Sequence, residues 1–400
     1  MTDRWLNIIG IGEDGLAGLS SLARTLVEGA EVIIGGDRHH DLTSVSKAER
    51  VSWPSPFDAM IETIRSYRGK RFVVLVTGDP LWFSVGARIV RSIPADEISL
   101  FPQLSAFQWA ASRLGWSLAD ADCLTAHGRP VENIVPFIQP GARLLILTTG
   151  SDTPAQVAKL LCDRGYSGSK MTIFAALGGP QEQRFDGFAD AWNLEVPAFN
   201  TLAVECIASA NAQVTSRLAG LPDHLFEHDG KMTKQEVRAV TLANLMPMRG
   251  ALLWDIGCGS GSVAIEWMRG APDAQAIGLE PRADRRAMAA RNAVALGAPR
   301  LQLLDATVPE GLADLGMPDA VFFGGGLSIE AVELAWTRLK PLGRLVANAV
   351  TLESESILLQ LFAKMGGDLT RIAIQRADPV GHLTGWRPMM PVTQWSLFKR

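Results

Sequence analysis

In the segment WDIGCGSGSVAIEW, residues 254–267, an apolar run leads into three alternating glycines and then a helical pattern. In open α/β sheets, ligands bind where a strand ends and the N-terminus of the next helix faces them. Gly257, Gly259 and Gly261 fall at such a place, and glycine permits a positive φ and a close approach of backbone to ligand. The stretch therefore predicts a strand, a nucleotide-binding turn and a helix.

The spacing of these glycines bears on which nucleotide binds. The dinucleotide fingerprint G-x-G-x-x-G/A requires Gly or Ala at position 262, where this chain has Ser262. This residue argues against an NAD-dependent dehydrogenase, an alternative that a test for nicotinamide binding would settle. Glu280, which ends the apolar run AIGLE, is expected at the end of the next strand, where a carboxylate accepts both ribose hydroxyls. NAD and S-adenosylmethionine both need such an acid, so Glu280 does not discriminate between them.

The spacing G-x-G-x-G, with Asp255 at the strand end, resembles motif I of the class I S-adenosylmethionine-dependent methyltransferases. The segment LLDAT, residues 303–307, resembles the adenine-binding segment of that family. The resemblance implies S-adenosylmethionine as cofactor, bound by Asp255, Gly257, Cys258, Gly259, Ser260, Gly261, Glu280, Asp305 and Ala306. A non-catalytic sensor of S-adenosylmethionine is a second alternative, and it would bind the cofactor without turning over a substrate.

The rest of the C-terminal half alternates apolar runs with helical patterns, which predicts a doubly wound α/β sheet. Strands are expected within residues 250–259, 274–282, 301–306, 318–326 and 343–351, and helices over 262–269, 282–296, 328–339 and 353–365. An earlier helix is expected to begin at Thr233 as N-cap, with Glu236 completing a capping box. Its apolar side is expected to consist of Val237, Val240, Leu242 and Leu245.

The N-terminal half also alternates strand and helix patterns. A strand within residues 5–12, a helical pattern through Leu19, Leu22 and Val27, and a second strand within 30–36 form a β-α-β unit. Strand patterns follow within 71–80, 98–101 and 142–149, the last two each leading into a helix. This order predicts an α/β domain with a largely parallel sheet.

Three segments of this half resemble the tetrapyrrole methylases, the class III methyltransferases. They are IIGIGEDGLAGLSSLARTLVEGAEVIIGG (residues 8–36), LVTGDPLWFSVG (75–86) and FPQLSAFQWAASRLGW (101–116). The resemblance covers roughly residues 4–205 and implies a second S-adenosylmethionine site without the class I glycine motif. Carried over residue by residue, that site consists of Gly78, Asp79, Trp82, Ser105 and Ala106.

Two histidine-containing segments of the N-terminal half call for separate interpretation. The triplet His127-Gly128-Arg129 is similar to the carbon-5 corrinoid methylase branch of the family, and an arginine fork suits substrate carboxylates. A solvated turn is the alternative interpretation of this triplet. His39 and His40 are adjacent, so they cannot face one ligand together, and we expect both at the surface.

In the C-terminal half, the segments 221–239, 319–326 and 344–354 resemble a carbon-15 methylating, decarboxylating branch of corrin methylases. A class III methylase followed by a class I methylase is similar to the bifunctional methyltransferases of cobalamin biosynthesis. This implies a tetrapyrrole methylase domain over 1–208, a linker over 209–228 and a Rossmann-like class I domain over 229–400. It further implies methylation of precorrin-6B at carbons 5 and 15 and loss of the ring-C acetate carboxylate, giving precorrin-8. Cobalt-containing precorrins of the anaerobic pathway are the alternative substrates.

Five residues are candidates for contacts at the carbon-15 site. Thr233 is expected to close over the cofactor, as the matching family position does, and Lys234 or Arg238 to meet substrate carboxylates. Gly325, in FFGGG, would let a broad ring lie flat against the backbone, unless the glycines only make a flexible turn. Asn348, in NAVTLES, is a candidate substrate contact. We assign no nucleophile for either reaction.

Composition and charge narrow the possible partners. The 400 residues are 47% hydrophobic and 20% charged with a net charge of −4, which predicts a globular protein that does not bind nucleic acid. The four cysteines form no CxxC pair, so neither a metal site nor a disulfide framework is expected. The N-terminus lacks a signal peptide, and no apolar run reaches the ~18 residues that span a bilayer, so a cytoplasmic protein is expected. The family resemblance implies a homo-oligomer, with dimerising N-terminal domains and a tetramer formed through the C-terminal domain.

Overall fold

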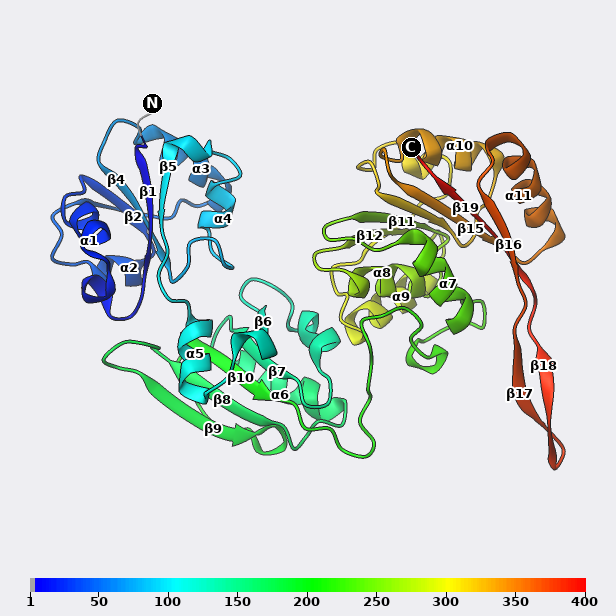
Figure 1. Ribbon diagram of the computed structural model, residues 1–400, viewed down its shortest axis with the longest axis horizontal. Coiled ribbons are helices and arrows are strands. Elements are labelled where there is room, and N and C mark those ends of the chain that lie inside the picture. The colour runs from blue at the N-terminus through cyan, green and yellow to red at the C-terminus, as the bar shows by residue number, and fades with distance from the viewer. Residues whose placement is uncertain (1–3) are drawn as a thin grey trace. The chain divides into compact units, whose positions relative to one another are not determined.

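The computed structural model describes residues 4–400 of the chain, which fold into two compact units (Figure 1). Unit 1 runs up to Val131 and includes Pro140–Gln213, whereas unit 2 comprises Glu132–Gln139 and Val214–Arg400. The stretch expected as a linker, 209–228, is therefore partly built into unit 2. There Leu221 and Phe226 are 3% and 4% exposed and pack against helices of that unit.

The first sheet of unit 1 is wholly parallel, with strand order β3-β2-β4-β1-β5. Its elements are β1 (Leu6–Ile11), α1 (Ser21–Glu28), β2 (Val32–Gly35), α2 (Asp37–Leu42), β3 (Glu49–Ser52), α3 (Met60–Ser66), β4 (Phe72–Thr77), α4 (Gly86–Ile89) and β5 (Ile98–Phe101). Ile8 packs toward α3 and α4, and its neighbour Ile9 packs toward α1, as the alternation of side chains along a strand requires. Leu22, expected on the apolar side of α1, is 60% exposed.

The second sheet of unit 1 is mixed, with order β6-β7-β10-β8-β9. Its elements are α5 (Ala106–Leu114), β6 (Asp122–Thr125), β7 (Arg143–Leu147), α6 (Thr153–Asp163), β8 (Lys170–Ala175), β9 (Gln183–Phe188) and β10 (Asn200–Glu205). Only β6 and β7 pair in parallel. The prediction of a largely parallel sheet is thus wrong for this half of unit 1, because β8 and β9 form a hairpin and β10 then inserts antiparallel between β7 and β8.

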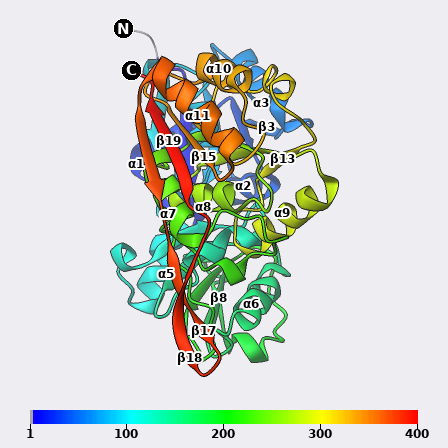
Figure 2. The same cartoon turned by 90° about the vertical axis from the view of Figure 1, so that its right-hand side faces the viewer.

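Unit 2 contains a seven-stranded sheet in the order β13-β12-β11-β14-β15-β19-β16, and a two-stranded hairpin β17-β18 that extends from it (Figures 1 and 2). Its helices and strands are α7 (Gln235–Leu245), β11 (Leu252–Ile256), α8 (Ser262–Gly270), β12 (Gln275–Leu279), α9 (Ala283–Ala295), β13 (Gln302–Leu304), β14 (Ala320–Phe323), α10 (Ile329–Arg338), β15 (Arg344–Ala349), α11 (Leu352–Met365), β16 (Asp368–Ile372), β17 (Gln375–Val380), β18 (Leu383–Pro388) and β19 (Val392–Phe398). All five expected strands form and pair in parallel.

Helices cover both faces of this sheet. Helices α7 and α8 pack on one face, around Leu253 and Phe322, and α10 and α11 pack on the other, around Trp254 and Phe323. Neighbouring residues of one strand thus face opposite layers, which gives the doubly wound arrangement that the sequence predicts. Among residues 4–400, no helix combines the length and the apolar character that crossing a membrane requires.

Helix α7 departs from the predicted boundary. Its N-cap is Lys234 rather than Thr233, and no side chain caps the helix. Glu236 does not complete a capping box, because its carboxylate forms an ion pair of 2.6 Å with Arg376 of β17. Val240, expected on the buried side, is 38% exposed.

Candidate functional site

Three successive strands of unit 2 end beside one another, and each end carries a predicted site residue. Strands β11, β12 and β13 are parallel neighbours, so their carboxyl ends lie at the same edge of the sheet. Gly257 follows β11, Glu280 follows β12 and Ala306 closely follows β13. The backbone N–H of Gly257 donates to the Leu279 carbonyl at 2.9 Å, which ties the glycine loop to the end of β12.

The glycine loop is in direct backbone contact with the loop that follows β14. Gly257 has a φ of 69°, and a Cβ at this position would lie 2.7 Å from the Cα and N atoms of Gly325. The N–H of Gly325 donates to the Ile256 carbonyl at 3.2 Å. No side chain fits between these loops, so the surface that they present is bare backbone.

Two carboxylates lie beneath this backbone surface. Glu280 is 3% exposed and accepts hydrogen bonds from the N–H groups of Gly259 and Arg282, both at 3.1 Å. Asp255 accepts from the Ala264 N–H at 3.0 Å through Oδ2, while its Oδ1 has no hydrogen-bond partner among the described residues. Burial, with a smaller contribution from Glu280, raises the pKa of Asp255 to about 7.

A cavity of about 1070 Å³ opens over this edge of the sheet. Eleven predicted residues line it: Thr233, Lys234, Asp255, Gly257, Cys258, Gly259, Ser260, Glu280, Ala306, Gly325 and Asn348. The cavity exceeds the range of roughly 300–1,000 Å³ that is typical of small-molecule sites. It therefore has room for a cofactor and a second molecule.

Gly261 and Asp305 lie outside the residues that line the cavity. Gly261 is the N-cap of α8 with a φ of 76°, and a Cβ there would lie 3.1 Å from the Cβ of Ala289 on α9. Its role is to let the two helices approach closely. The Asp305 side chain is 70% exposed and pairs with Arg286 at 2.8 Å, so the structure does not support it as a cofactor contact. Its neighbour Ala306 lines the cavity instead.

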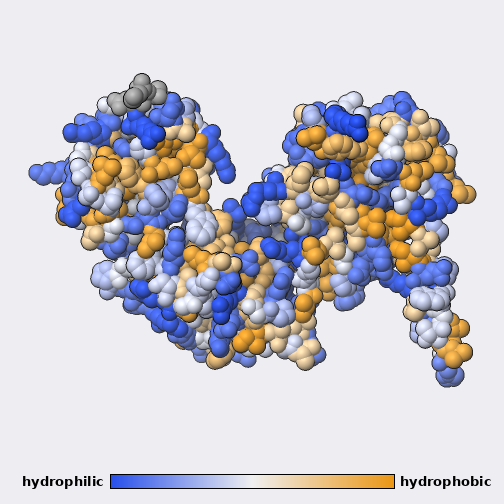
Figure 3. All heavy atoms as spheres, in the orientation of Figure 1, coloured by the Kyte–Doolittle hydropathy of each residue, from blue (hydrophilic) through white to orange (hydrophobic). Residues whose placement is uncertain are grey.

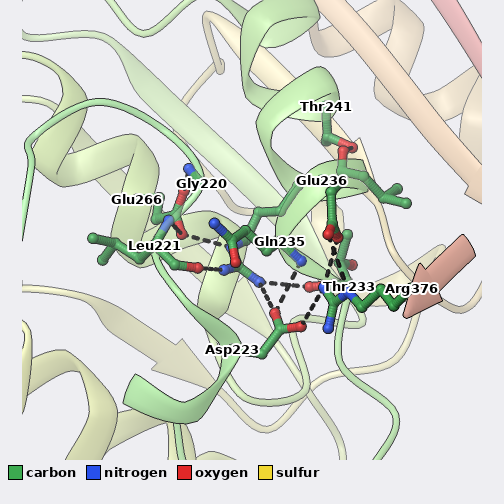
Figure 4. A network of polar contacts seen from close by, with 11 residues as sticks. Gly220, Leu221, Asp223, Thr233, Gln235, Glu236, Thr241, Glu266 and Arg376 are labelled. Carbon is green, nitrogen blue, oxygen red and sulfur yellow. Dashed lines mark hydrogen bonds and ion pairs between the residues drawn. The ribbon is translucent and has the colours of Figure 1, made fainter. Parts of the chain in front are cut away.

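The structure contradicts the prediction that Arg238 contacts substrate carboxylates. Its side chain is completely buried, and its guanidinium donates to Glu266 at 2.6 Å, to Asp223 at 3.2 Å and to the carbonyls of Leu221 and Thr233. Figure 4 labels these four partners. With these partners it does not reach the cavity, so it is not a substrate contact. Instead it fixes the segment before α7, in which Lys231, Thr233 and Lys234 line the cavity, against helix α8.

A second contact joins the same segment to the glycine loop. The Asn292 side chain, on α9, is 2% exposed in total and exchanges hydrogen bonds with the backbone of Glu227, at 2.8 Å and 2.9 Å. Its Nδ2 also donates to the Ser260 carbonyl at 2.9 Å. One amide thus sets the distance between the segment before α7 and the glycine loop.

The predicted site of unit 1 lies where its two sheets meet. Gly78 has a φ of 62°, and a Cβ there would lie 2.9 Å from the Cα of Ser105. A small cavity of about 40 Å³ is lined by Gly78 and Ala106 together with residues of both sheets. Asp79 accepts from the N–H of Leu81 within its turn, and the Trp82 ring packs on Phe107 with centroids 4.9 Å apart.

The structure shows the local surroundings of Ser105 and of the two histidine-containing segments. The Ser105 side chain and backbone both bond Gln108 in a capping box at the start of α5. His127 and Arg129 lie in an exposed turn, with the Arg129 guanidinium 5.7 Å from the centre of the Phe83 ring. His39 and His40 are half-buried, so the expectation that both are surface residues is wrong. The Nδ1 of His39 accepts from the Gly36 N–H, and burial, with Arg38 and His40 adding, lowers its pKa to about 4.

Comparison with known proteins shows the family to which the chain belongs. The model of tetrapyrrole (corrin/porphyrin) methylases matches residues 6–191, and that of the precorrin methyltransferase domain matches residues 224–399. The precorrin-6Y C(5,15)-methyltransferase (decarboxylating) of a Sinorhizobium species is 46% identical, over 99% of this chain and 96% of its own length. The protein of that name from Mycobacterium tuberculosis strain H37Rv is 36% identical, over 98% of this chain and 99% of its own. The chain belongs to this family of decarboxylating precorrin-6Y methyltransferases.

Among solved structures, the C-terminal domain of precorrin-6Y C5,15-methyltransferase from Rhodobacter capsulatus is 48% identical to this chain. It covers 46% of this chain and 100% of its own, with a TM-score of 0.44. In this precorrin-6Y methyltransferase family member, the two matched domain models correspond in order to units 1 and 2.

Several residues that line the cavity of unit 2 were not predicted from the sequence. They are Lys231, Arg282, Arg285, Val308, Val350, Ile374, Met389, Met390 and Val392. Of these, Ile374, Met389 and Met390 flank the β17-β18 hairpin and Val392 begins β19, in a region where no strand was predicted. The turn formers Pro379 and Gly381 between two short runs of mixed polarity were the available signal.

Proposed function

We propose that the chain methylates precorrin-6B at carbons 5 and 15 and removes carbon dioxide from its ring-C acetate, in cobalamin biosynthesis, with S-adenosylmethionine as methyl donor. Unit 1 carries the carbon-5 reaction, and unit 2 carries the carbon-15 reaction and the decarboxylation. The observation that supports this most directly is the cavity of unit 2, which is lined both by the bare backbone of two glycine loops and by apolar side chains. Full-length relatives of the same family support the pairing of the two reactions.

The residues of unit 2 fit S-adenosylmethionine. Gly257 and Gly325 leave a backbone surface that an added Cβ would obstruct, and such a surface suits the flat, polar nucleoside part. The Glu280 carboxylate, which follows β12 and lines the cavity, is the proposed acceptor for the ribose hydroxyls. When bound, the cofactor supplies an electrophilic sulfonium methyl group. The chain's task is then to orient that methyl and to exclude water from it.

Other residues that line the cavity fit a large ring with acidic side chains. Met389, Met390 and Val392 contribute apolar surface, and Lys231 and Lys234 contribute positive charge from the segment before α7. A meso carbon of a reduced tetrapyrrole is enamine-like and already nucleophilic, so methyl transfer chiefly requires alignment of the two reacting atoms. A strong general base is not required for that step.

The proposal is tested by incubating the full chain with S-adenosylmethionine and precorrin-6B in the absence of oxygen and following products by mass spectrometry. We expect two added methyl groups and the loss of one carbon dioxide per ring. A parallel incubation uses the cobalt complex of the same ring. Activity on the cobalt complex alone would move the chain to the anaerobic pathway. No change in either ring would contradict the proposal and would favour a protein that only binds the cofactor.

We further propose that the chain forms a homo-oligomer through unit 2. Hydrophobic side chains gather toward the tip of the β17-β18 hairpin (Figure 3), where Val380 and Leu383 are 65% and 78% exposed. Trp386, on β18, is 73% exposed. Apolar side chains so exposed on a projecting hairpin are suited to contact another copy. Sedimentation of the full chain and of Leu383→Glu tests this, with loss of the larger species expected for the variant.

A cytoplasmic location is proposed as well. The cysteines of the chain, Cys123, Cys162, Cys206 and Cys258, are free thiols, as is usual in a reducing compartment. Fractionation of cells that express the full chain tests this location.

A further inference from the structure

A cluster of four polar side chains, which we call the amide cluster, adjoins the unit 2 cavity, and one of the four lines it. Asn348 of β15 lines the cavity, and Gln394 is its register partner on β19. Thr241 and Asn244 lie on α7. Thr241 and Gln394 are 0% and 1% exposed. Buried polar groups of this kind require complete hydrogen bonding.

The polarity of the amide cluster follows from a single backbone carbonyl. The carbonyl oxygen of Val237 can only accept, so the Thr241 hydroxyl, 2.8 Å away, donates its one hydrogen to it. The amide groups of Asn348 and Gln394, each 3.0 Å from Thr241 Oγ1, must then donate to that oxygen through their nitrogens. Nitrogen and oxygen positions in both amides are therefore fixed by chemistry.

The remaining contacts of the amide cluster agree with this assignment. Gln394 Nε2 donates its second hydrogen to Asn348 Oδ1 at 2.9 Å, and Gln394 Oε1 accepts from Asn244 Nδ2 at 2.6 Å. A flipped Asn348 amide would oppose its nitrogen to that of Gln394 and its oxygen to that of Thr241. The native orientation is thus locked. Asn348 retains one N–H on Nδ2 and one lone pair on Oδ1 for a ligand in the cavity.

The residues that line the cavity offer a substrate carboxylate both neutral and cationic donors. Asn348 is a neutral donor on β15, whereas Lys231 and Lys234 are cations from the segment before α7. The difference matters for a carboxylate that must leave as carbon dioxide. A cation beside the carboxylate would stabilise its charge before the reaction, whereas a neutral donor orients it with less stabilisation.

We propose that Asn348 Nδ2 donates a hydrogen bond to the substrate carboxylate that is lost, and that Thr241 and Gln394 are positioning residues that lock this donor. The inference rests on the proposed decarboxylation. In that step the bond between the acetate methylene and its carboxylate carbon breaks, and carbon dioxide leaves. The bonding electron pair passes into the conjugated ring imines, and the product takes up one proton from water.

Thr241→Val in the full chain tests the lock, because valine keeps the shape of the side chain but removes the hydroxyl. We expect carbon dioxide release in a single turnover to slow roughly tenfold to hundredfold, the effect of misplacing one hydrogen bond to a charged group. Affinity for S-adenosylmethionine should not change. Thr241→Ser, which keeps the hydroxyl, should restore the parental rate. Thr337→Val is the matched control, since its hydroxyl donates to a helix carbonyl at an exposed position of α10.

Asn348→Asp tests the donor itself, because aspartate has nearly the same shape but only accepts. We expect weaker binding of the tetrapyrrole, measured by absorbance titration without cofactor, and slower release of carbon dioxide. Parental binding and parental release in both Asn348→Asp and Thr241→Val would overturn the inference. If the parent protein itself binds no tetrapyrrole, the proposed function is contradicted. That outcome is distinct from failure of the inference, which is judged from the variants.

Discussion

The two units build their candidate cofactor sites in different ways. Unit 2 uses the carboxyl edge of one parallel sheet, where Gly257, Glu280 and Ala306 follow adjacent strands and face a cavity of about 1070 Å³. Unit 1 uses the meeting of two sheets, where Gly78 touches Ser105 and the cavity is about 40 Å³. A site on one sheet is formed as soon as its strands pair. A site between two sheets also depends on how those sheets pack.

The comparison extends to how each site is supported. In unit 2, the buried Arg238 and Asn292 fix the cavity-lining segment before α7 to helices α8 and α9. In unit 1, Arg38 pairs with Glu13 and lies 4.1 Å from the centre of the exposed Phe199 ring at the rim of the cavity. The site of unit 2 is therefore held by buried polar contacts, whereas that of unit 1 is held by partly exposed ones.

The largest effect is expected from removing the buried cation of unit 2. Arg238→Met leaves Glu266 without its charged partner in the interior, which typically costs about 3–5 kcal/mol. The variant should be destabilised in unit 2. Calorimetry should then show the unfolding transition of unit 2 at a much lower temperature, while that of unit 1 stays unchanged. Arg291→Met is the control, because its ion pair with Glu227 is 59% exposed at the arginine and should change stability by less than about 0.5 kcal/mol. A normal melting curve with only a raised KM would instead restore Arg238 as a substrate contact.

The next effect concerns the backbone surface of unit 2. Gly257→Ala places a Cβ 2.7 Å from the backbone of Gly325, and we expect S-adenosylmethionine binding and carbon-15 methylation to fall by about a hundredfold or more. Carbon-5 methylation should persist, as measured by mass spectrometry of the product. Gly250→Ala is the matched control, because its φ of 70° imposes the same backbone strain, but no atom lies within 4 Å of its Cβ. Equal losses in the two variants would mean that strain, rather than contact, is responsible.

The corresponding change in unit 1 should have a smaller effect. Gly78→Ala brings a Cβ to 2.9 Å from the Cα of Ser105, and α5, which begins at Ala106, is able to shift slightly because the second sheet is a separate layer. We expect carbon-5 methylation to fall roughly tenfold, with carbon-15 methylation unchanged. Gly115→Ala, with a φ of 66° and no atom within 4 Å of its Cβ, is the control. Loss of both methylations would show that the two units do not act independently.

Much of this architecture could be predicted because apolar strands and glycine turns are local features. The five parallel strands of unit 2 and the series Gly257, Glu280 and Ala306 follow from runs of residues that are close in sequence. The role of Arg238 could not be predicted in this way, because its partner Glu266 lies on another helix and arginine is rarely buried. The capping box predicted for Thr233 and Glu236 is absent for the same reason. The Glu236 carboxylate pairs instead with Arg376, which lies 140 residues further along the chain.

Other differences between prediction and structure concern the direction in which a side chain or a strand points. Asp305 and Ala306 are adjacent, yet only the alanine faces the cavity, and a resemblance to a family segment does not show which of the two turns inward. The β17-β18 hairpin contributes to the cavity wall only at its ends, beside Ile374 and Met389, while its strands extend away from the sheet. Turn formers between short runs of mixed polarity predict such a hairpin but not the surface that it contacts.

The smallest effect is expected from Asp255, and it depends on pH. Because the pKa of Asp255 is raised to about 7 in the folded chain, folding favours the protonated carboxyl, and this stabilisation is present below about pH 4 and is lost as the pH rises through 7. Asp255→Asn removes the charge, and the new amide oxygen still accepts from Ala264. We expect the variant to gain about 1 kcal/mol or more over the parent at pH 8 but little at pH 4.5, measured by urea unfolding without cofactor. Asp273→Asn, at an exposed ion pair, should show no such dependence. If the gain is the same at both pH values, Asp255 is ionised throughout, and the buried charge of unit 2 is tolerated as readily as the partly exposed charges of unit 1.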